Sequence, residues 1–392
     1  MGRTWTLSLL FATACWGAQA ATIFDFDGRV LTISTERYVV TWRDGGCAGL
    51  TTLLPARRVV AAPDGPMTTD LLPTGLCSLY GHEEEARAQH HPWAFRDLEA
   101  RYPGQHPPGP ETEVTCEEIP GGRRLTYRGL VGEPQAVLVQ ELSVAEETGD
   151  LIIRQRAASS NPGLLGISLP LLNLDPDVVL AVPYFGGQRW GRRFLEGRAM
   201  GIAYTQFWHA SLVIGELPSG GTFMLWAEDP NMRPKWLYAR HQGDALGLSV
   251  EALPEAPYDD RTEVEVFAWR LNTFAGNWLE PAARYKQWMV RTWNLVPRTQ
   301  RSSGWVDDIA LIWPKWINAT LMDQMARLIE PERVLIMQWG WLPGFNRRVP
   351  EYIPKDEGFA DQVRLAHDRG FRVGGYTSQG LIDIQTHPTM VA

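Results

Sequence analysis

The sequence predicts a multidomain protein of the β and α/β classes, with a large antiparallel β-sandwich followed by the first three βα units of an incomplete TIM barrel. Short alternating or apolar runs, broken by Gly, Pro and Asp, extend from Thr22 to about Arg270. The hydrophobic period then becomes helical, and beyond Ser303 apolar strands alternate with helical segments. We therefore expect a leader at 1–20, a sandwich at 21–272, a connecting helix and linker at 273–303, and a partial barrel at 304–392.

Composition supports a folded, acidic protein. The chain has 392 residues, 44% of them hydrophobic and 21% charged, which permits sizeable cores and excludes disorder as the main state. Its formal net charge is -8, and no block of Lys and Arg offers the clustered cations that nucleic acid requires, so no nucleic-acid partner is expected. The 17 Trp residues suit both core filling and stacking on sugar rings.

The first 20 residues have the pattern of a signal peptide. Arg3 precedes an apolar run from Trp5 to Trp16, and Ala18-Gln19-Ala20 forms a small-x-small cleavage site. The mature chain is therefore expected to begin near Ala21 and to be secreted or periplasmic. Lipidation of Cys15 is the alternative, although the usual Leu three residues earlier is missing. A membrane-spanning helix takes about 20 apolar residues, and no such run follows, so no membrane span is expected.

The sandwich is predicted from many short strand patterns in one block. The Glu263–Trp269 run alternates strictly, which indicates one wet face and one buried face. The other expected strands are Val30–Ile33, Tyr38–Trp42, Arg124–Tyr127, Ala136–Leu142, Leu151–Arg156, Ser211–Ile214 and Thr222–Trp226.

The connecting helix is expected over Asn277–Trp293, because apolar residues recur there at spacings of three and four. Trp278, Ala282, Tyr285, Trp288 and Met289 fall on one face of such a helix. A polar linker, Pro297–Ser303, follows.

The remainder predicts a parallel β-α-β-α-β succession. Its expected strands lack hydrophobic alternation, as in strands covered on both faces. In chain order, the elements are a strand at Asp308–Trp313, a helix at Ala319–Ile329, a strand at Arg333–Trp339, a helix at Gly358–Arg369 and a strand at Phe371–Tyr376. A complete (β/α)₈ barrel takes about 250 residues, whereas fewer than a hundred follow Ser303. We therefore expect a truncated gene product or fragment.

Candidate binding residues follow from this topology, because parallel barrels place function at the C-terminal ends of their strands. An aromatic wall with a few polar groups suits a carbohydrate, whose ring faces stack while its hydroxyls need hydrogen-bond partners. Alternatively, the tryptophans fill the core and Lys315 is a solvated charge. No cofactor and no metal site are expected. The candidates are Trp313 and Lys315 after the first strand, Trp339 and Trp341 after the second, and Tyr376 and Asp383 after the third.

Four segments resemble a family of carbohydrate-active enzymes. Gln206–His209 with Thr222–Pro230 looks like the late sandwich strands of glycoside-hydrolase-like proteins related to endo-α-N-acetylgalactosaminidases, and Ala283–Trp288 is similar to their helix leading into the barrel. Met337–Trp341, with Pro350–Pro354, is similar to the Asp-Asp-Gly-Trp strand end of the α-galactosidase clan, but Gln338 and Trp339 stand in place of its two aspartates. Gly358–Gly370 leading into Arg372–Tyr376 resembles that clan's second helix and third strand.

This resemblance covers about two thirds of the chain and implies a galactose-mutarotase-like β-supersandwich before a catalytic barrel. It implies hydrolysis of O-glycosidic bonds by paired carboxylates on the fourth and later barrel strands, which lie beyond residue 392, so that this portion alone is inactive. The alternatives are a noncatalytic carbohydrate-binding protein or, less favoured, a polysaccharide lyase with a Tyr or His base.

Overall fold

A computed structural model describes residues 22–52, 59–61, 79–81, 105–184, 186–196, 199–204, 207–218, 220–242, 244–255, 260–297, 300, 304–314, 318–338, 341 and 358–376. The chain divides into two compact units, residues 1–294 and 295–392, and each is described by itself.

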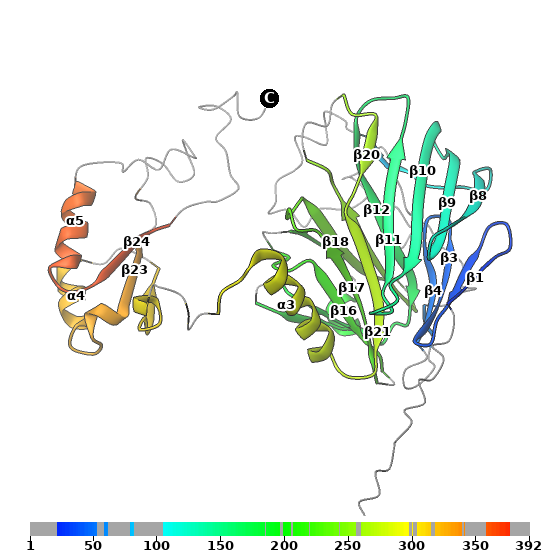
Figure 1. The fold of residues 1–392 in the computed structure, drawn as a ribbon. Coiled ribbons are helices and arrows are strands. Elements are labelled where there is room, and N and C mark those ends of the chain that lie inside the picture. Colours follow the sequence, from blue (N-terminus) through cyan, green and yellow to red (C-terminus); the bar gives the residue numbers. More distant parts are fainter. Residues whose placement is uncertain are drawn as a thin grey trace, which may run out of the picture. The chain divides into compact units, whose positions relative to one another are not determined.

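The first unit contains two large, mainly antiparallel sheets, as the sequence predicts (Figure 1). One sheet has the order β1-β2-β3-β4-β5-β12-β19-β18-β15, and two short strands, β6 and β7, extend it beside β12. Its strands are β1 (Ile23–Phe26), β2 (Leu31–Ser34), β3 (Tyr38–Arg43), β4 (Gly46–Thr52), β5 (Val59–Ala61), β6 (Leu79–Gly81), β7 (Gln105–His106), β12 (Leu164–Leu174), β15 (Ala199–Tyr204), β18 (Lys235–Gln242) and β19 (Ala245–Ala252).

The second sheet has the order β14-β13-β16-β17-β21-β11-β10-β9-β8, and β20 also pairs with β11. Its strands are β8 (Glu113–Ile119), β9 (Gly122–Leu130), β10 (Glu133–Val144), β11 (Leu151–Ala158), β13 (Val179–Val182), β14 (Gln188–Trp190), β16 (Leu212–Glu216), β17 (Thr222–Glu228), β20 (Glu263–Glu265) and β21 (Ala268–Phe274). A short helix, α2 (Arg192–Leu195), follows β14.

One apolar core fills the space between the sheets, because alternate side chains of each strand point inward. Four fully buried tryptophans anchor it: Trp42, Trp190, Trp208 and Trp269. The indole N–H of Trp42 donates to Gln140 Oε1 at 2.9 Å, and the Gln140 amide donates to the Gly45 carbonyl at 2.8 Å. These four tryptophans therefore serve as core.

Helix α3 (Leu279–Trp293) covers part of the outer face of the second sheet (Figure 1). Tyr285, Trp288 and Met289 pack onto Trp226 and its neighbours, and the ring centroids of Trp226 and Trp288 lie 5.1 Å apart. Trp278 departs from the predicted apolar face: it is the N-cap residue, one position before the helix, and is 42% exposed.

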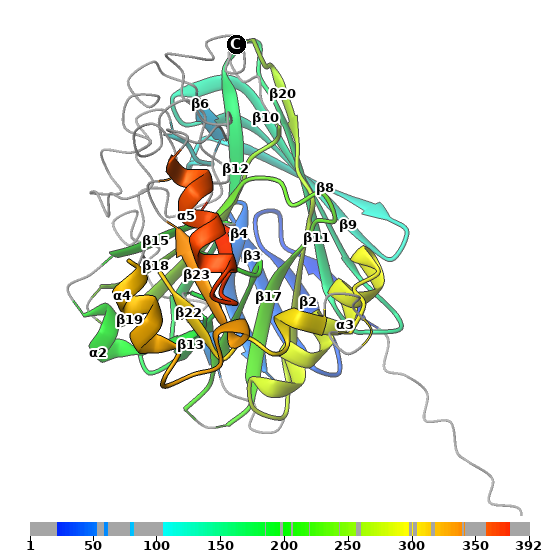
Figure 2. The same ribbon diagram turned by 90° about the vertical axis from the view of Figure 1, so that its left-hand side faces the viewer.

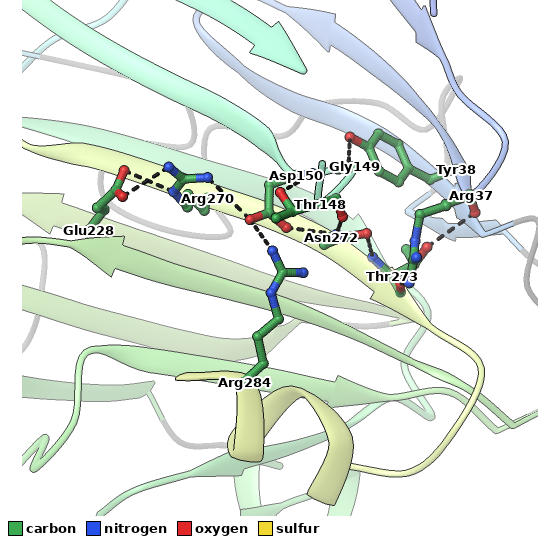
Figure 3. A network of polar contacts seen from close by, with 10 residues as sticks. All are labelled: Arg37, Tyr38, Thr148, Gly149, Asp150, Glu228, Arg270, Asn272, Thr273 and Arg284. Atoms are coloured by element: carbon green, nitrogen blue, oxygen red, sulfur yellow. Dashed lines mark hydrogen bonds and ion pairs between the residues drawn. The ribbon is translucent and has the colours of Figure 1, made fainter. Parts of the chain in front are cut away.

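A polar network fastens α3 to the sandwich (Figure 3). The carboxylate of Asp150 is buried and accepts hydrogen bonds from Asn272 Nδ2 at 2.7 Å, from Arg270 at 3.3 Å and from Arg284 of α3. Arg270 also donates through two nitrogens to Glu228, at 2.8 and 2.9 Å. Such paired, charge-assisted bonds fix geometry as well as adding stability.

The second unit contains a parallel sheet of β22 (Leu311–Trp313), β23 (Val334–Gln338) and β24 (Arg372–Gly375), in that order. Helices α4 (Ala319–Met325) and α5 (Gly358–His367) pack on one face of this sheet through Met322, Met325 and Ala366 (Figure 2). Two short 3₁₀ turns, η3 (Gly304–Val306) and η4 (Pro331–Arg333), precede β22 and β23. This is the predicted β-α-β-α-β succession.

Asn318 caps α4, since its side chain accepts from Leu321 N at 2.9 Å. Within the described residues, none of the helices is long and apolar enough to cross a membrane.

Candidate active site

The C-terminal ends of the three parallel strands form the candidate site, because βα loops converge at this edge. The register sets β23 beside β24, with Gln338 opposite Gly375, and the backbone N–H of Tyr376 donates to the Gln338 carbonyl at 3.0 Å. Trp313, the last residue of β22, pairs with Ile336. The strand ends therefore stand side by side, as the sequence predicts.

Trp341 and Tyr376 are brought together at this edge. The indole N–H of Trp341 donates to the Tyr376 carbonyl at 2.7 Å, and the indole stacks on Phe359 of α5 with a centroid distance of 5.6 Å. A Cβ atom on Gly375 would lie only 2.8 Å from Trp341 Cε2. The glycine therefore lets the indole lie directly against the strand end, which holds one aromatic face in a fixed position.

Trp313 and Gln338 lie on the helix-covered face of the sheet. Trp313 packs against the cluster that includes Met322 and Ile336, and Gln338 shares the face of Val334 and Ile336 by strand alternation. Gln338 is 7% exposed. Its Oε1 atom and the Nε1 atom of Trp313 are buried without hydrogen-bond partners among the described residues. An unpaired buried polar group costs about 1–3 kcal/mol, so the indole donor and the amide acceptor both lower the stability of this sheet.

The remaining predicted site residues, Lys315, Trp339 and Asp383, lie outside the described residues. Phe359, Gly375 and the buried side chain of Gln338 were not predicted as site residues. The Gly374-Gly375 pair at a strand end is a sequence signal for close approach of another group, and it could have identified Gly375.

The described part of this edge can bind but has no group to cleave. Trp341, Gly375 and Tyr376 supply an aromatic ring and backbone groups at this edge, and none of Trp313, Gln338, Trp341, Gly375 and Tyr376 carries a carboxylate. This chemistry matches a neutral, polyhydroxylated ligand. General acid and nucleophile chemistry would need carboxyl groups from elsewhere.

Comparison with known families gives one match. Residues 266–389 match a family described as a domain of unknown function, DUF6259. The match runs from the end of the sandwich through α3 and most of the second unit. No curated protein matches the sequence.

Comparison with solved structures shows which folds this chain is similar to. The ligand-free α-N-acetylgalactosaminidase NagBb from Bifidobacterium bifidum is similar to this chain at 12% identity with a TM-score of 0.54, over 94% of this chain and 61% of the enzyme. The GalNAc complex of the same enzyme is similar with a TM-score of 0.55 at 12% identity, over 92% and 61%. This chain thus spans about three fifths of the length of that enzyme. The fold of this chain is therefore similar to that of the enzyme over the part that aligns.

Proposed function

We propose that this chain is the N-terminal part of an exported glycoside hydrolase that acts on O-glycosidic bonds of a glycan. One observation carries the proposal: the succession of sandwich, α3 and parallel βα units aligns over 94% of the chain with an α-N-acetylgalactosaminidase. The fixed aromatic face of Trp341 at the C-terminal strand edge agrees with a sugar-binding role.

The β22–β24 sheet acts in this proposal as the first three strands of a (β/α)₈ barrel. Trp341 and Tyr376 form one wall of the substrate site, and Lys315, Trp339 and Asp383, which lie outside the described residues, stay predicted substrate-binding residues. Trp313 and Gln338 support this wall from the helix-covered side. The two catalytic carboxyl groups, held about 5–9 Å apart, come from later barrel strands in a longer product, so this portion alone is inactive.

Export follows from the leader at residues 1–20. Cleavage after Ala20 leaves β1, which begins at Ile23, intact in the sheet. The mature protein would therefore act on glycans outside the cytoplasm.

The test is to sequence the gene past the codon for Ala392, express the longer product from Ala21, and assay it with aryl α-N-acetylgalactosaminides and aryl α-galactosides. We expect released sugar, lost when a carboxylate on the fourth or a later barrel strand is changed to its amide. Residues 21–392 alone should release none.

A gene that ends at Ala392, or a longer product that binds glycans without cleaving them, would overturn the hydrolase and leave a carbohydrate-binding protein. An unsaturated uronate product would instead identify a lyase.

A further inference from the structure

Within the described residues, the parallel sheet of the second unit has helices on one face only (Figure 2). Helices α4 and α5 pack on the face that carries Ile336. Successive side chains of a strand point to opposite faces. Ile312 of β22, Leu335 and Met337 of β23, and Gly374 of β24 therefore belong to the other face. We call this second face, defined by these four residues, the open face.

The strand register makes the open face a continuous apolar surface. Ile312 pairs with Leu335, and Met337 pairs with Gly374. A Cβ atom on Gly374 would lie 3.6 Å from Leu335 Cδ1 and 3.6 Å from Met337 Sδ. The two side chains of β23 therefore border the space above the glycine, and apolar atoms extend across all three strands.

The open face is apolar but exposed. Ile312 is 56% exposed, and Leu335 and Met337 are half-buried. Arg372 pairs with Leu335 and is the only charged residue among the described strand positions of this face. Its Nε donates to the Glu332 carbonyl at 3.0 Å, and its guanidinium lies 4.8 Å from the ring centroid of Trp305. Because parallel sheets are covered on both faces in almost all proteins, the open face requires a partner.

The small area of the open face distinguishes between possible partners. With strands about 4.8 Å apart and a rise of about 3.3 Å per residue, three short strands present roughly 200 Å². A stable interface between separate chains buries about 800 Å² on each partner, so this face is too small to hold a second copy of the chain. A covalently attached segment docks at a much higher effective concentration. Among the described strands, β22 and β24 are the two edges of the sheet, so further strands can pair with both.

We infer that the open face is the docking surface for parallel strands that follow residue 392 in a longer product. Apolar side chains of those strands cover Ile312, Leu335 and Met337, so that the open face lies inside the protein and the helix-covered face points outward. This docking rests on the proposed function, because only the longer product contains those strands.

The experiment measures the accessibility of a thiol placed on the open face by Ile312→Cys. The variant is made both in residues 21–392 and in the longer product from Ala21, and each protein is treated with N-ethylmaleimide under native conditions. Mass spectrometry of the peptide that contains position 312 distinguishes this thiol from the native cysteines. We expect rapid modification in residues 21–392. In the longer product it should be at least about a hundredfold slower, because a covered face reacts only through local unfolding.

Leu328→Cys is the matched control, since Leu328 is exposed in the turn after α4 and lies outside the open face. Its thiol should react equally fast in both proteins. Met337→Cys is a second probe of the open face and should be protected in the longer product as Ile312→Cys is.

Rapid modification of both open-face probes in the longer product would overturn the inference. Slow modification already in residues 21–392, or a gene that ends at Ala392, would overturn it too. A longer product that protects both probes but releases no sugar would refute the hydrolase alone. Release of sugar by a longer product whose probes stay accessible would refute the docking alone.

Discussion

Lys235 places a positive charge inside the sandwich, where its side chain is fully buried. Its ammonium donates to Asp229 Oδ2 at 2.8 Å and to the Arg233 carbonyl at 2.7 Å, and lies 3.9 Å from the ring centroid of Tyr204. Burial lowers the pKa of Lys235 to about 8, against the opposing effect of Asp229. Burial alone would raise the pKa of Asp229, but hydrogen bonds from Lys235 and Arg233 outweigh it and lower that pKa.

Lys235→Met should destabilise the protein by about 3 kcal/mol, because removing one partner leaves a buried carboxylate poorly compensated. The unaltered protein should lose the stability contributed by Asp229 only as pH falls below about 4, since a lowered carboxyl pKa favours the folded state above the unfolded pKa. In Lys235→Met the pKa of Asp229 should rise towards its unfolded value, so this acid-induced loss of stability should become smaller. Urea unfolding at several pH values measures both effects.

Lys286→Met is the control for this change, since Lys286 is exposed on α3. If both variants unfold at the same urea concentration at every pH, the buried pair contributes nothing to stability.

Helix α3 is also held by a buried carboxylate paired with a cation, because Arg284 joins it to Asp150 of the β10–β11 turn. Tyr285 adds a second tie: its hydroxyl accepts from Ser211 N at 3.2 Å and lies 3.0 Å from Ser211 Oγ. The helix is thus held by an ion pair, a hydroxyl pair and an apolar face together.

Arg284→Met should loosen α3 without unfolding the sheet, since Arg270 and Asn272 still satisfy Asp150. The lost charged hydrogen bond corresponds to about 1.5–3 kcal/mol. Hydrogen exchange of the amides of 279–293 should become faster, and exchange in β17 should not. Arg291→Met, at an exposed position of the same helix, should leave the exchange rates in both segments unchanged. Equal exchange rates in the two variants would show that the ion pair of Arg284 with Asp150 does not hold the helix.

The strand edge offers a second test at this scale. Gly375→Ala should displace the Trp341 indole, because the new Cβ would lie 2.8 Å from Cε2. Gly374→Ala should be tolerated, because the nearest atom, Leu335 Cδ1, would be 3.6 Å away. The NMR signal of the Trp341 indole N–H, which reports its bond to the Tyr376 carbonyl, should shift in the first variant only. Equal shifts would mean that close approach at Gly375 does not position the indole.

Element boundaries were only partly predictable, and the Glu263–Trp269 segment shows why. Its alternation predicts one strand, but Val266 and Phe267 are both buried, at 5% and 4% exposure, and the ladder is interrupted there. Strand β20 ends at Glu265 and β21 begins at Ala268. Two consecutive inward side chains cannot fit a regular pleat, and only the packing partners reveal that both turn inward.

The whole molecule has separate cores in its two units. The sandwich core is large, whereas the described core of the second unit consists of Met322, Met325, Val334, Ile336, Ala366 and Phe371. Small cores supply little stability.

We therefore expect two calorimetric transitions, with the second unit unfolding at the lower temperature. Met322→Ala, which should cost about 2–5 kcal/mol as a core truncation, should lower only the transition temperature of the second unit. Leu237→Ala in the sandwich core should lower only the transition temperature of the sandwich. A single transition that both variants shift equally would show that the units unfold together.

Much of this architecture was predictable because the spacing of apolar residues along the chain differs between strands and helices. The change from alternation to helical spacing located α3, and the uninterrupted apolar strands located the parallel sheet. The contacts of the candidate site were harder to predict from the sequence. The contact of Trp341 with Gly375 and Phe359 joins residues distant in the chain, and the burial of Gln338 depends on helices packed above it. Such long-range contacts leave no periodic signal.

The close pair of Trp226 and Trp288 has an optical consequence. Two indoles whose ring centroids are 5.1 Å apart and whose planes are inclined at 60° couple their electronic transitions. One indole belongs to β17 and the other to α3, so the resulting circular-dichroism couplet exists only while the helix is seated on the sheet. The protein thus carries its own unlabelled reporter for undocking of this helix, readable in real time by a stopped-flow spectrometer.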